Sequence, residues 1–165
     1  MPITIRPTIK EDVSELLAIY NEEVLHGTAT FDLIPKTLAE RETWFIEHQA
    51  GGYPLLTGEI DGHIAGYASL SPYRQKDAYA GTAELSVYVH TSYRQQGIAT
   101  ALMEAILQEA RQGDRFHAIV SVITGGNEAS VRLHERFGFT FCGSLREVGY
   151  KLGAYRDVLN YELLL

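Results

Sequence analysis

The sequence has few of the features that mark secreted, membrane or nucleic-acid-binding proteins. Its single cysteine, Cys142, cannot form a disulfide within the chain. No apolar run approaches the roughly 20 residues of a membrane-spanning helix, and the first residues do not have the pattern of a signal peptide. Acidic residues outnumber basic ones by 21 to 14, which gives no basic field for a phosphate backbone. We expect a cytoplasmic protein with no membrane or nucleic-acid partner.

Metal-ligand spacing is also missing. Five of the six histidines are scattered along the chain, and no cysteine pair accompanies them: His26, His48, His63, His90 and His117. We expect no metal. Cys142 has no paired histidine and aspartate nearby, which favours a buried structural thiol over a nucleophile.

The length fits one folding unit. A chain of 165 residues with 45% hydrophobic and 21% charged residues is typical of a single soluble domain, and no repeat, linker or low-complexity segment divides it. We therefore expect one domain over residues 1–165.

Hydrophobic periodicity predicts the elements of the first half. Ile3–Arg6 alternates like a strand, and Thr8 with Glu11 forms a T-x-x-E capping box before a helix. A second box, at Thr37 and Glu40, precedes a second helix. The segment from residue 26 to 35 between the helices is a candidate substrate flap. Two strands, residues 54–60 and 63–70, flank an Asp-Gly dipeptide that favours a hairpin turn.

The second half alternates strands and helices. A polar loop, residues 71–82, precedes a strand at 83–90 that turns Ala83, Leu85, Val87 and Val89 to one face. A helix follows residue 97, a strand spans 117–123, and Asn127 can cap a helix that ends before Gly138. Segments 140–145 and 157–164 are the closing strands. The order is β-α-α-β-β-β-α-β-α-β-β.

The segment Arg94-Gln95-Gln96-Gly97-Ile98-Ala99 lies between a strand and a helix. A helix N-terminus offers unpaired N–H groups and a partial positive charge, so it can hold a pyrophosphate. Gly97 allows a close backbone approach, and Ala99 is small. In isolation such a hexamer is more often an ordinary strand-to-helix turn; its placement favours the binding function.

With this element order, the R-x-x-G-x-A segment resembles the acyl-CoA signature of the GNAT superfamily of N-acetyltransferases. The resemblance implies an α/β (α+β) GNAT fold, in which a mixed, mostly antiparallel sheet of about seven strands is flanked by four helices and splays between strands 4 and 5. It also implies acetyl-CoA as co-substrate, transferred directly to an amine in a ternary complex.

Further segments resemble the phosphinothricin and methionine sulfoximine acetyltransferase branch. They are Thr82-Ala83-Glu84 with Ser86–Val89, residues 130–135 before Gly138-Phe139, and the early Ile19–Asn21 and Trp44-Phe45. The branch implies a small acceptor with an α-amino group, such as phosphinothricin, methionine sulfoximine or methionine sulfone.

The resemblance implies a coenzyme site in which the pantetheine arm pairs with the strand edge. The residues expected to bind the coenzyme are Val87, Tyr88, Val89, Arg94, Gln95, Gln96, Gly97, Ile98, Ala99, Thr100, Asn127 and Ser130. Asn127 can act as helix cap alone or also contact the pantetheine.

Two side chains are candidates for proton transfer. Glu84 is the expected base that deprotonates the amine, with a backbone N–H near Val87 stabilising the oxyanion; position alone equally allows a solvated residue in a salt bridge. His134 occupies a position where many family members have a tyrosine that protonates the thiolate. It acts either as an acid or base near its usual pKa of about 6.5 or as a packed residue that shapes the site.

An amino-acid acceptor needs donors for its carboxylate and aromatic walls. The candidates are Arg74 and Lys76 for charge, and Phe31, Tyr73 and Tyr79 for the walls. In related enzymes the pocket lies near a dimer interface, so we expect a homodimer in which the late loop with Tyr150, Lys151 and Tyr155 contributes. The alternatives are a GNAT enzyme for polyamines or protein N-termini, and an acyl-CoA-binding module without catalysis.

Overall fold

A computed structural model describes residues 2–165 as an alternation of strands and helices. Within them the order is β1 (Ile3–Pro7), α1 (Val13–His26), α2 (Leu38–Gly51), β2 (Leu55–Ile60), β3 (His63–Pro72), β4 (Thr82–Val89), α3 (Ile98–Ala110), β5 (Ala118–Thr124), α4 (Glu128–Arg136), β6 (Thr140–Lys151) and β7 (Ala154–Leu164). Short 3-10 helices lie at Lys10–Asp12, Asp77–Tyr79 and Thr91–Tyr93. The predicted order is confirmed. No helix in this part of the chain has the length and apolar character to span a membrane.

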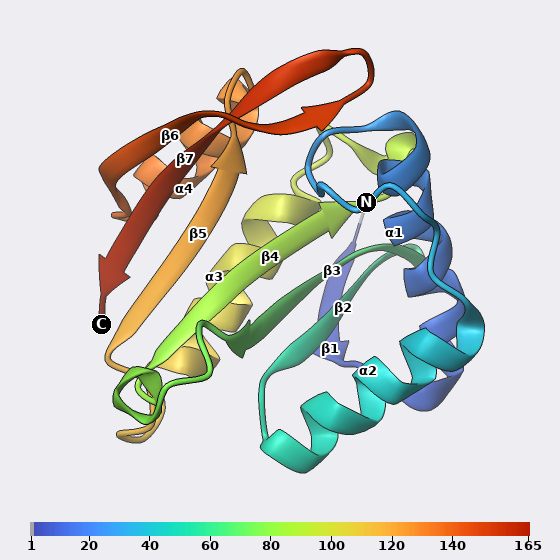
Figure 1. Cartoon of the computed structure of the whole chain (residues 1–165). Coiled ribbons are helices and arrows are strands. Elements are labelled where there is room, and N and C mark those ends of the chain that lie inside the picture. The colour runs from blue at the N-terminus through green and yellow to red at the C-terminus, as the bar shows by residue number, and fades with distance from the viewer. Residues whose placement is uncertain (1) are drawn as a thin grey trace.

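The strands form one sheet in the order β1-β2-β3-β4-β5-β7-β6. All neighbours are antiparallel except β4 and β5, which run parallel and pair only from Thr82 with Ala118 to Glu84 with Val120. Beyond Glu84 the two strands diverge (Figure 1). The predicted mixed, mostly antiparallel sheet with a splay between strands 4 and 5 is therefore confirmed.

Helices cover both faces of the sheet, and successive residues of a strand pack into the two hydrophobic clusters on its opposite faces. Leu56 and Ala68 join the larger cluster against α3, whereas Leu55 and Tyr67 join a smaller one with α1. The α4 side chain of Leu133 packs against the larger cluster. Figure 1 shows α1 and α2 in front of the sheet and α3 behind it.

Local signals at turns and helix ends are mostly confirmed. Thr37 and Glu40 form the expected capping box of α2, Asp61 and Gly62 adopt φ of 51° and 78° in the β2–β3 hairpin, and Gly138 has a φ of 88° after α4. Such left-handed conformations suit glycine and, less readily, Asp.

The capping box predicted at Thr8 and Glu11 is wrong. The Asp12 carboxylate accepts the Ile9 N–H at 2.9 Å and two donors of Arg6. Thr8 instead hydrogen-bonds the Thr57 hydroxyl at 2.8 Å. The Thr8 hydroxyl thus bonds to Thr57 on β2 instead of capping a helix, and α1 begins one turn later than the predicted capping box implied.

The closing hairpin is longer than predicted. Strands β6 and β7 meet at Lys151 and Ala154, so the expected late loop is a two-stranded ribbon. A register shift between Leu145 and Gly149 interrupts the alternation of apolar and polar residues along β6. Because of this interruption, the sequence predicted a strand that ends at residue 145. Cys142, expected to be buried, is exposed on β6, because no layer within the described chain covers this edge strand.

Candidate active site

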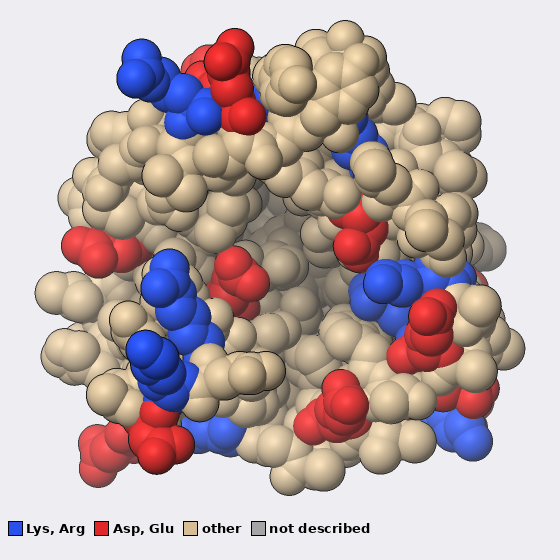
Figure 2. Space-filling view, in the orientation of Figure 1, with Lys and Arg blue, Asp and Glu red and all other residues tan. Residues whose placement is uncertain are grey.

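The divergence of β4 and β5 leaves a cleft of about 620 Å³. Figure 2 shows it as a hollow at the centre of one face, with acidic and basic side chains around its rim. Its walls come from α1, the second half of β4, the N-terminus of α3, the end of β5 and α4. Almost all residues predicted to bind the coenzyme line it: Val87, Tyr88, Val89, Arg94, Gln95, Gly97, Ile98, Ala99, Thr100, Asn127 and Ser130.

The start of α3 is shaped for an anion. Gln95 and Gly97 have φ of 61° and 89°, which folds the chain tightly before Ile98. No side chain caps this helix, so its first N–H groups lack intrahelical partners and point into the cleft region. Gln96 turns away, and its amide donates to the Ser92 carbonyl at 3.2 Å. It lines neither of the two cavities described here.

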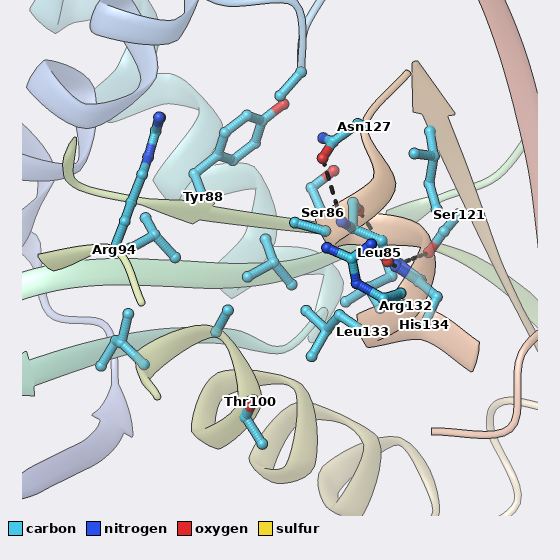
Figure 3. Close-up of a pocket in the computed structure, with 18 of the residues that line it drawn as sticks. Leu85, Ser86, Tyr88, Arg94, Thr100, Ser121, Asn127, Arg132, Leu133 and His134 are labelled. Carbon is cyan, nitrogen blue, oxygen red and sulfur yellow. Dashed lines mark hydrogen bonds between the residues drawn. The ribbon is translucent and has the colours of Figure 1, made fainter. Parts of the chain in front are cut away.

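Arg94 lies at the cleft but contacts an acid on another helix. Its guanidinium donates to Glu23 of α1 at 3.3 Å, and Figure 3 shows the side chain extending away from Thr100. The pair is partly exposed, so its contribution to stability is small. Its geometry links α1 to the turn before α3 across one end of the cleft.

The free edge of β4 presents backbone groups to the cleft. The His90 N–H donates to the Ala65 carbonyl of β3 at 2.8 Å. Because N–H groups alternate in direction along a strand, those of Val87 and Val89 point the other way, toward the gap left by β5. An extended ligand can pair there as an added strand.

Helix α4 contributes polar groups that sequence reasoning missed. Asn127 caps the helix and accepts the Ser130 N–H at 3.2 Å, as expected of a cap. Arg132 and Arg136 also line the cleft, and Arg136 donates to Thr100 at 3.5 Å. Their spacing of four residues, which places them on one helix face, was the available signal. These cations stand at the cleft of a chain whose net charge is -7.

A second cavity of about 260 Å³ adjoins the cleft and contains Glu84 and Phe31. The two share the residues Ala29, Leu85, Ser86, Tyr88, Val122 and Thr124. Glu84 is half-buried, and no side chain of residues 2–165 forms a hydrogen bond or ion pair with its carboxylate. Burial raises the pKa of Glu84 above its usual value. The solvated salt bridge considered from the sequence is absent from this part of the chain.

The predicted flap after α1 is anchored at several points. Lys151 of β6, only 3% exposed, donates to the carbonyls of Glu23 at 3.1 Å and Thr30 at 2.8 Å. Asn21 bonds both backbone groups of Lys36 at 2.9 Å. Figure 1 shows the β6–β7 hairpin reaching over this segment. The segment is thus a fixed wall of the second cavity.

The Phe31 ring packs closely against Gly149 of the β6–β7 hairpin. A Cβ built on Gly149 would lie 2.4 Å from the Phe31 ring, far inside van der Waals contact. Only glycine lets the hairpin backbone and this ring approach so closely.

Tyr88 forms a rigid floor between the two cavities. Its ring stacks on Tyr67 and meets the edge of Tyr20, with centroids 5.4 Å apart in both cases. The same aromatic cluster contains Arg41, which is 7% exposed and whose guanidinium carbon lies 3.7 Å from the centroid of the Trp44 ring. Burial raises the pKa of Tyr88 well above its usual range, so its hydroxyl stays neutral.

The loop before β4 packs on itself, outside both cavities. Tyr73 and Tyr79 meet edge to face at 5.4 Å, and the Arg74 guanidinium lies 5.0 Å from the Tyr73 ring. The structure therefore does not bring Tyr73, Arg74, Lys76 and Tyr79 together with Phe31 within one chain. Their role in acceptor binding stays a prediction.

His134 lines the cleft from α4 with both ring nitrogens occupied (Figure 3). Nδ1 lies 2.7 Å from the Ser130 carbonyl, and Nε2 lies 2.9 Å from the Ser121 hydroxyl. Burial lowers the pKa of His134 below its usual value, and the bond to Ser130 opposes this in part. Ser121 was missed from the sequence; the signal was a polar residue that shares a strand face with Ile119 and Ile123.

No cluster of three or more potential metal ligands occurs among residues 2–165. The candidate chemistry of the site rests on Glu84, His134, backbone amides and the cations of α4.

The sequence matches the acetyltransferase (GNAT) family over residues 11–139. The chain belongs to this family. Its fold and the position of the cleft agree with that assignment.

Similar proteins cover nearly the whole chain. A phosphinothricin N-acetyltransferase of Streptomyces coelicolor is 41% identical, covering 97% of this chain and 95% of its own length. An L-methionine sulfoximine/L-methionine sulfone acetyltransferase of Pseudomonas aeruginosa is 38% identical, covering 99% and 95%. The crystal structure of a phosphinothricin acetyltransferase from Sinorhizobium meliloti, in complex with acetyl-CoA, is 30% identical with a TM-score of 0.95, covering 100% and 89%.

Proposed function

We propose that this chain transfers the acetyl group of acetyl-CoA to the α-amino group of a small amino-acid-like acceptor of the phosphinothricin, methionine sulfoximine or methionine sulfone type. The observation that carries the proposal is the unpaired, half-buried Glu84 in a small cavity that opens into the coenzyme cleft. The names of the similar proteins from Streptomyces and Pseudomonas support the acceptor class.

The residues of the cleft fit acetyl-CoA. The uncapped N-terminus of α3 suits the pyrophosphate, and Arg132 and Arg136 suit further phosphate charge. The free edge of β4 offers Val87 and Val89 to the amides of pantetheine. This arrangement leads the thioester toward the point where the cleft meets the second cavity.

The reaction proceeds by direct attack within a ternary complex. Glu84 accepts a proton from the acceptor ammonium, and the free amine attacks the thioester carbonyl. The N–H of Val87 stabilises the oxyanion of the tetrahedral adduct. Collapse of the adduct breaks the C–S bond and releases the coenzyme thiolate. The nitrogen of the adduct gives up its second proton and the thiolate takes up one, so the products are a neutral amide and a thiol.

The size and lining of the second cavity favour a small acceptor. Its volume of about 260 Å³ is below the range of drug-sized pockets, which begins near 300 Å³. Beside Glu84 its polar side chains are hydroxyls: Thr30, Ser86, Tyr88 and Thr124. An amino-acid analogue finds hydrogen-bond partners there, whereas a peptide N-terminus needs an open groove.

The proposal includes a homodimer that uses the outer face of the β6–β7 hairpin. Several large apolar side chains of this hairpin are more than half exposed: Phe141, Leu145, Val148, Tyr150, Leu152 and Tyr155. Such a patch is typical of a protein interface. Lys151 points inward to the flap instead. Sedimentation tests this proposal. A wild-type protein that is monomeric and fully active contradicts it, and the substitution Leu145→Glu is expected to dissociate the dimer.

The test of the activity is thiol release from acetyl-CoA with phosphinothricin, methionine sulfoximine, methionine sulfone, a polyamine and a peptide as separate acceptors. We expect strong turnover with the three amino-acid analogues only. Turnover confined to polyamine or peptide overturns the acceptor class. Tight acetyl-CoA binding without turnover of any acceptor overturns the catalytic proposal and leaves an acyl-CoA-binding module.

A further inference from the structure

The hydrogen bonds of His134 define its protonation. A carbonyl oxygen only accepts, so the 2.7 Å contact with Ser130 O requires a hydrogen on Nδ1. In a neutral ring Nε2 is then an acceptor, and the Ser121 hydroxyl, at 2.9 Å, donates to it. The imidazole therefore rests as the Nδ1–H tautomer, with its one basic lone pair directed at Ser121.

Within residues 2–165, the Ser121 hydroxyl is the only hydrogen-bond partner of this lone pair. His134 is 6% exposed, and its ring meets that of Phe139 edge to face with centroids 5.0 Å apart. Ser121 itself lines the cleft, although it is only 2% exposed. Its hydroxyl uses one hydrogen toward His134 and keeps lone pairs that can accept a proton from the cleft side. Ser121 thus connects Nε2 to the cleft through one hydrogen-bonded hydroxyl.

We propose that Ser121 is a proton relay between His134 and the reacting atoms, an inference that rests on the proposed acetyl transfer. The acceptor ammonium carries two protons that must leave: Glu84 takes the first. The nitrogen of the tetrahedral adduct gives the second to Ser121 Oγ while the Ser121 proton moves to His134 Nε2. After the C–S bond breaks, the imidazolium returns its proton through Ser121 to the thiolate. Serine and histidine end as they began.

The surroundings of the ring favour this two-way transfer. The side chains of residues 2–165 that stack on the ring or hydrogen-bond to it are Phe139, Tyr161, Ser121 and Ser130, and of these Tyr161 is the titratable one. Burial raises the pKa of Tyr161 above its usual value, so it stays neutral, and no carboxylate pairs with the imidazolium. A proton on this buried ring is readily given to a thiolate, whose conjugate thiol has a pKa near 8.5.

The test compares Ser121→Ala with Ser121→Thr, which keeps the hydroxyl. Ser69→Ala is the matched control, because Ser69 is also a buried strand serine, 4% exposed, yet lines neither cavity. At saturating acetyl-CoA and acceptor we expect kcat to fall by about tenfold or more in Ser121→Ala, with the KM for acetyl-CoA unchanged. Ser121→Thr and Ser69→Ala are expected to stay within about threefold of the wild type.

A proton inventory in mixed light and heavy water separates a relay from a packing role. We expect a curved dependence of kcat on deuterium content in the wild type and Ser121→Thr, and a linear one in Ser121→Ala. An unchanged kcat in Ser121→Ala, or equal loss in the alanine and threonine variants with unchanged curvature, overturns the relay alone. A wild type that acetylates no amine overturns both proposals, so the two failures are distinguishable.

Discussion

Replacing Gly149 by alanine tests whether the C-terminal hairpin sets the size of the acceptor cavity. The new Cβ would lie 2.4, 2.6 and 2.9 Å from three atoms of the Phe31 ring, whereas ordinary contact begins at 3.4 Å. The ring must therefore retreat by about 1 Å, or the hairpin must bend. Because Phe31 lines the second cavity, retreat moves it into the space proposed for the acceptor.

The expected effect is selective for the acceptor. A displacement of about 1 Å can cost on the order of 100-fold in rate when it misplaces a reacting group, so we expect kcat/KM for the acceptor to fall by about 10- to 100-fold. The KM for acetyl-CoA should not change, since neither Gly149 nor Phe31 lines the first cleft. Overpacking should also lower the free energy of unfolding by about 1–3 kcal/mol.

Initial rates with each substrate varied in turn measure this selectivity. Gly81→Ala is the matched control, because its Cβ meets no atom closer than 3.9 Å. In a Phe31→Ala background the clash is gone, so Gly149→Ala should add little further loss. An equal loss of kcat/KM in both backgrounds, or a loss shared by acetyl-CoA, would refute the argument.

Three further outcomes are expected. Glu84→Gln should lower kcat by about 10²- to 10⁴-fold without changing acetyl-CoA affinity, and should remove the rise of the wild-type rate with pH through the raised pKa of Glu84; unchanged turnover contradicts its role as base. Lys151→Met should lower the free energy of unfolding in urea by about 1.5–3 kcal/mol, because two buried carbonyls lose a charged donor; a variant as stable as the wild type refutes the anchor. Burial lowers the pKa of both His48 and His134, so the unfolded chain binds more protons below pH 6.5 and the free energy of unfolding should fall as pH drops from about 7 toward about 5. Glu84, whose pKa is raised, opposes that trend. In urea titrations the free energy of unfolding should therefore fall more steeply with decreasing pH in Glu84→Gln than in the wild type. A free energy of unfolding that does not change with pH in either protein contradicts this prediction.

Elements specified by neighbouring residues were predictable. The Asp61-Gly62 turn, the Thr37 and Glu40 capping box and the helix start after Gly97 each need only a few adjacent residues. The length of the last hairpin was not predictable, because its strands pair across a bulge and its outer face is uncovered, which removes the apolar and polar alternation. The exposure of Cys142 follows from the same sheet order, which places β6 at the edge.

Much of the lining of the cleft was predictable for the same reason, whereas the contacts that hold the wall of the second cavity were not. One wall of the cleft is a contiguous strand, turn and helix, from Leu85 to Thr100, so a short motif in the sequence indicates it. The flap wall instead depends on Lys151 and Thr30, which lie 121 residues apart in sequence, and the Ser121 contact on His134 crosses from β5 to α4. No local sequence pattern predicts contacts between residues so far apart in the chain.

The topology explains why the proposed coenzyme and acceptor sites adjoin at β4. A parallel neighbour requires a crossover connection, and here α3 supplies it between β4 and β5, so the start of α3 lies at the end of β4. The pairing of β4 with β5 stops at Glu84, which leaves the following backbone free for an extended ligand and places the carboxylate where that free edge begins. The proposed base and the proposed coenzyme edge are thus consecutive parts of one strand. The flap and the β6–β7 hairpin form the proposed acceptor wall separately, so its side chains can change without altering the proposed coenzyme site.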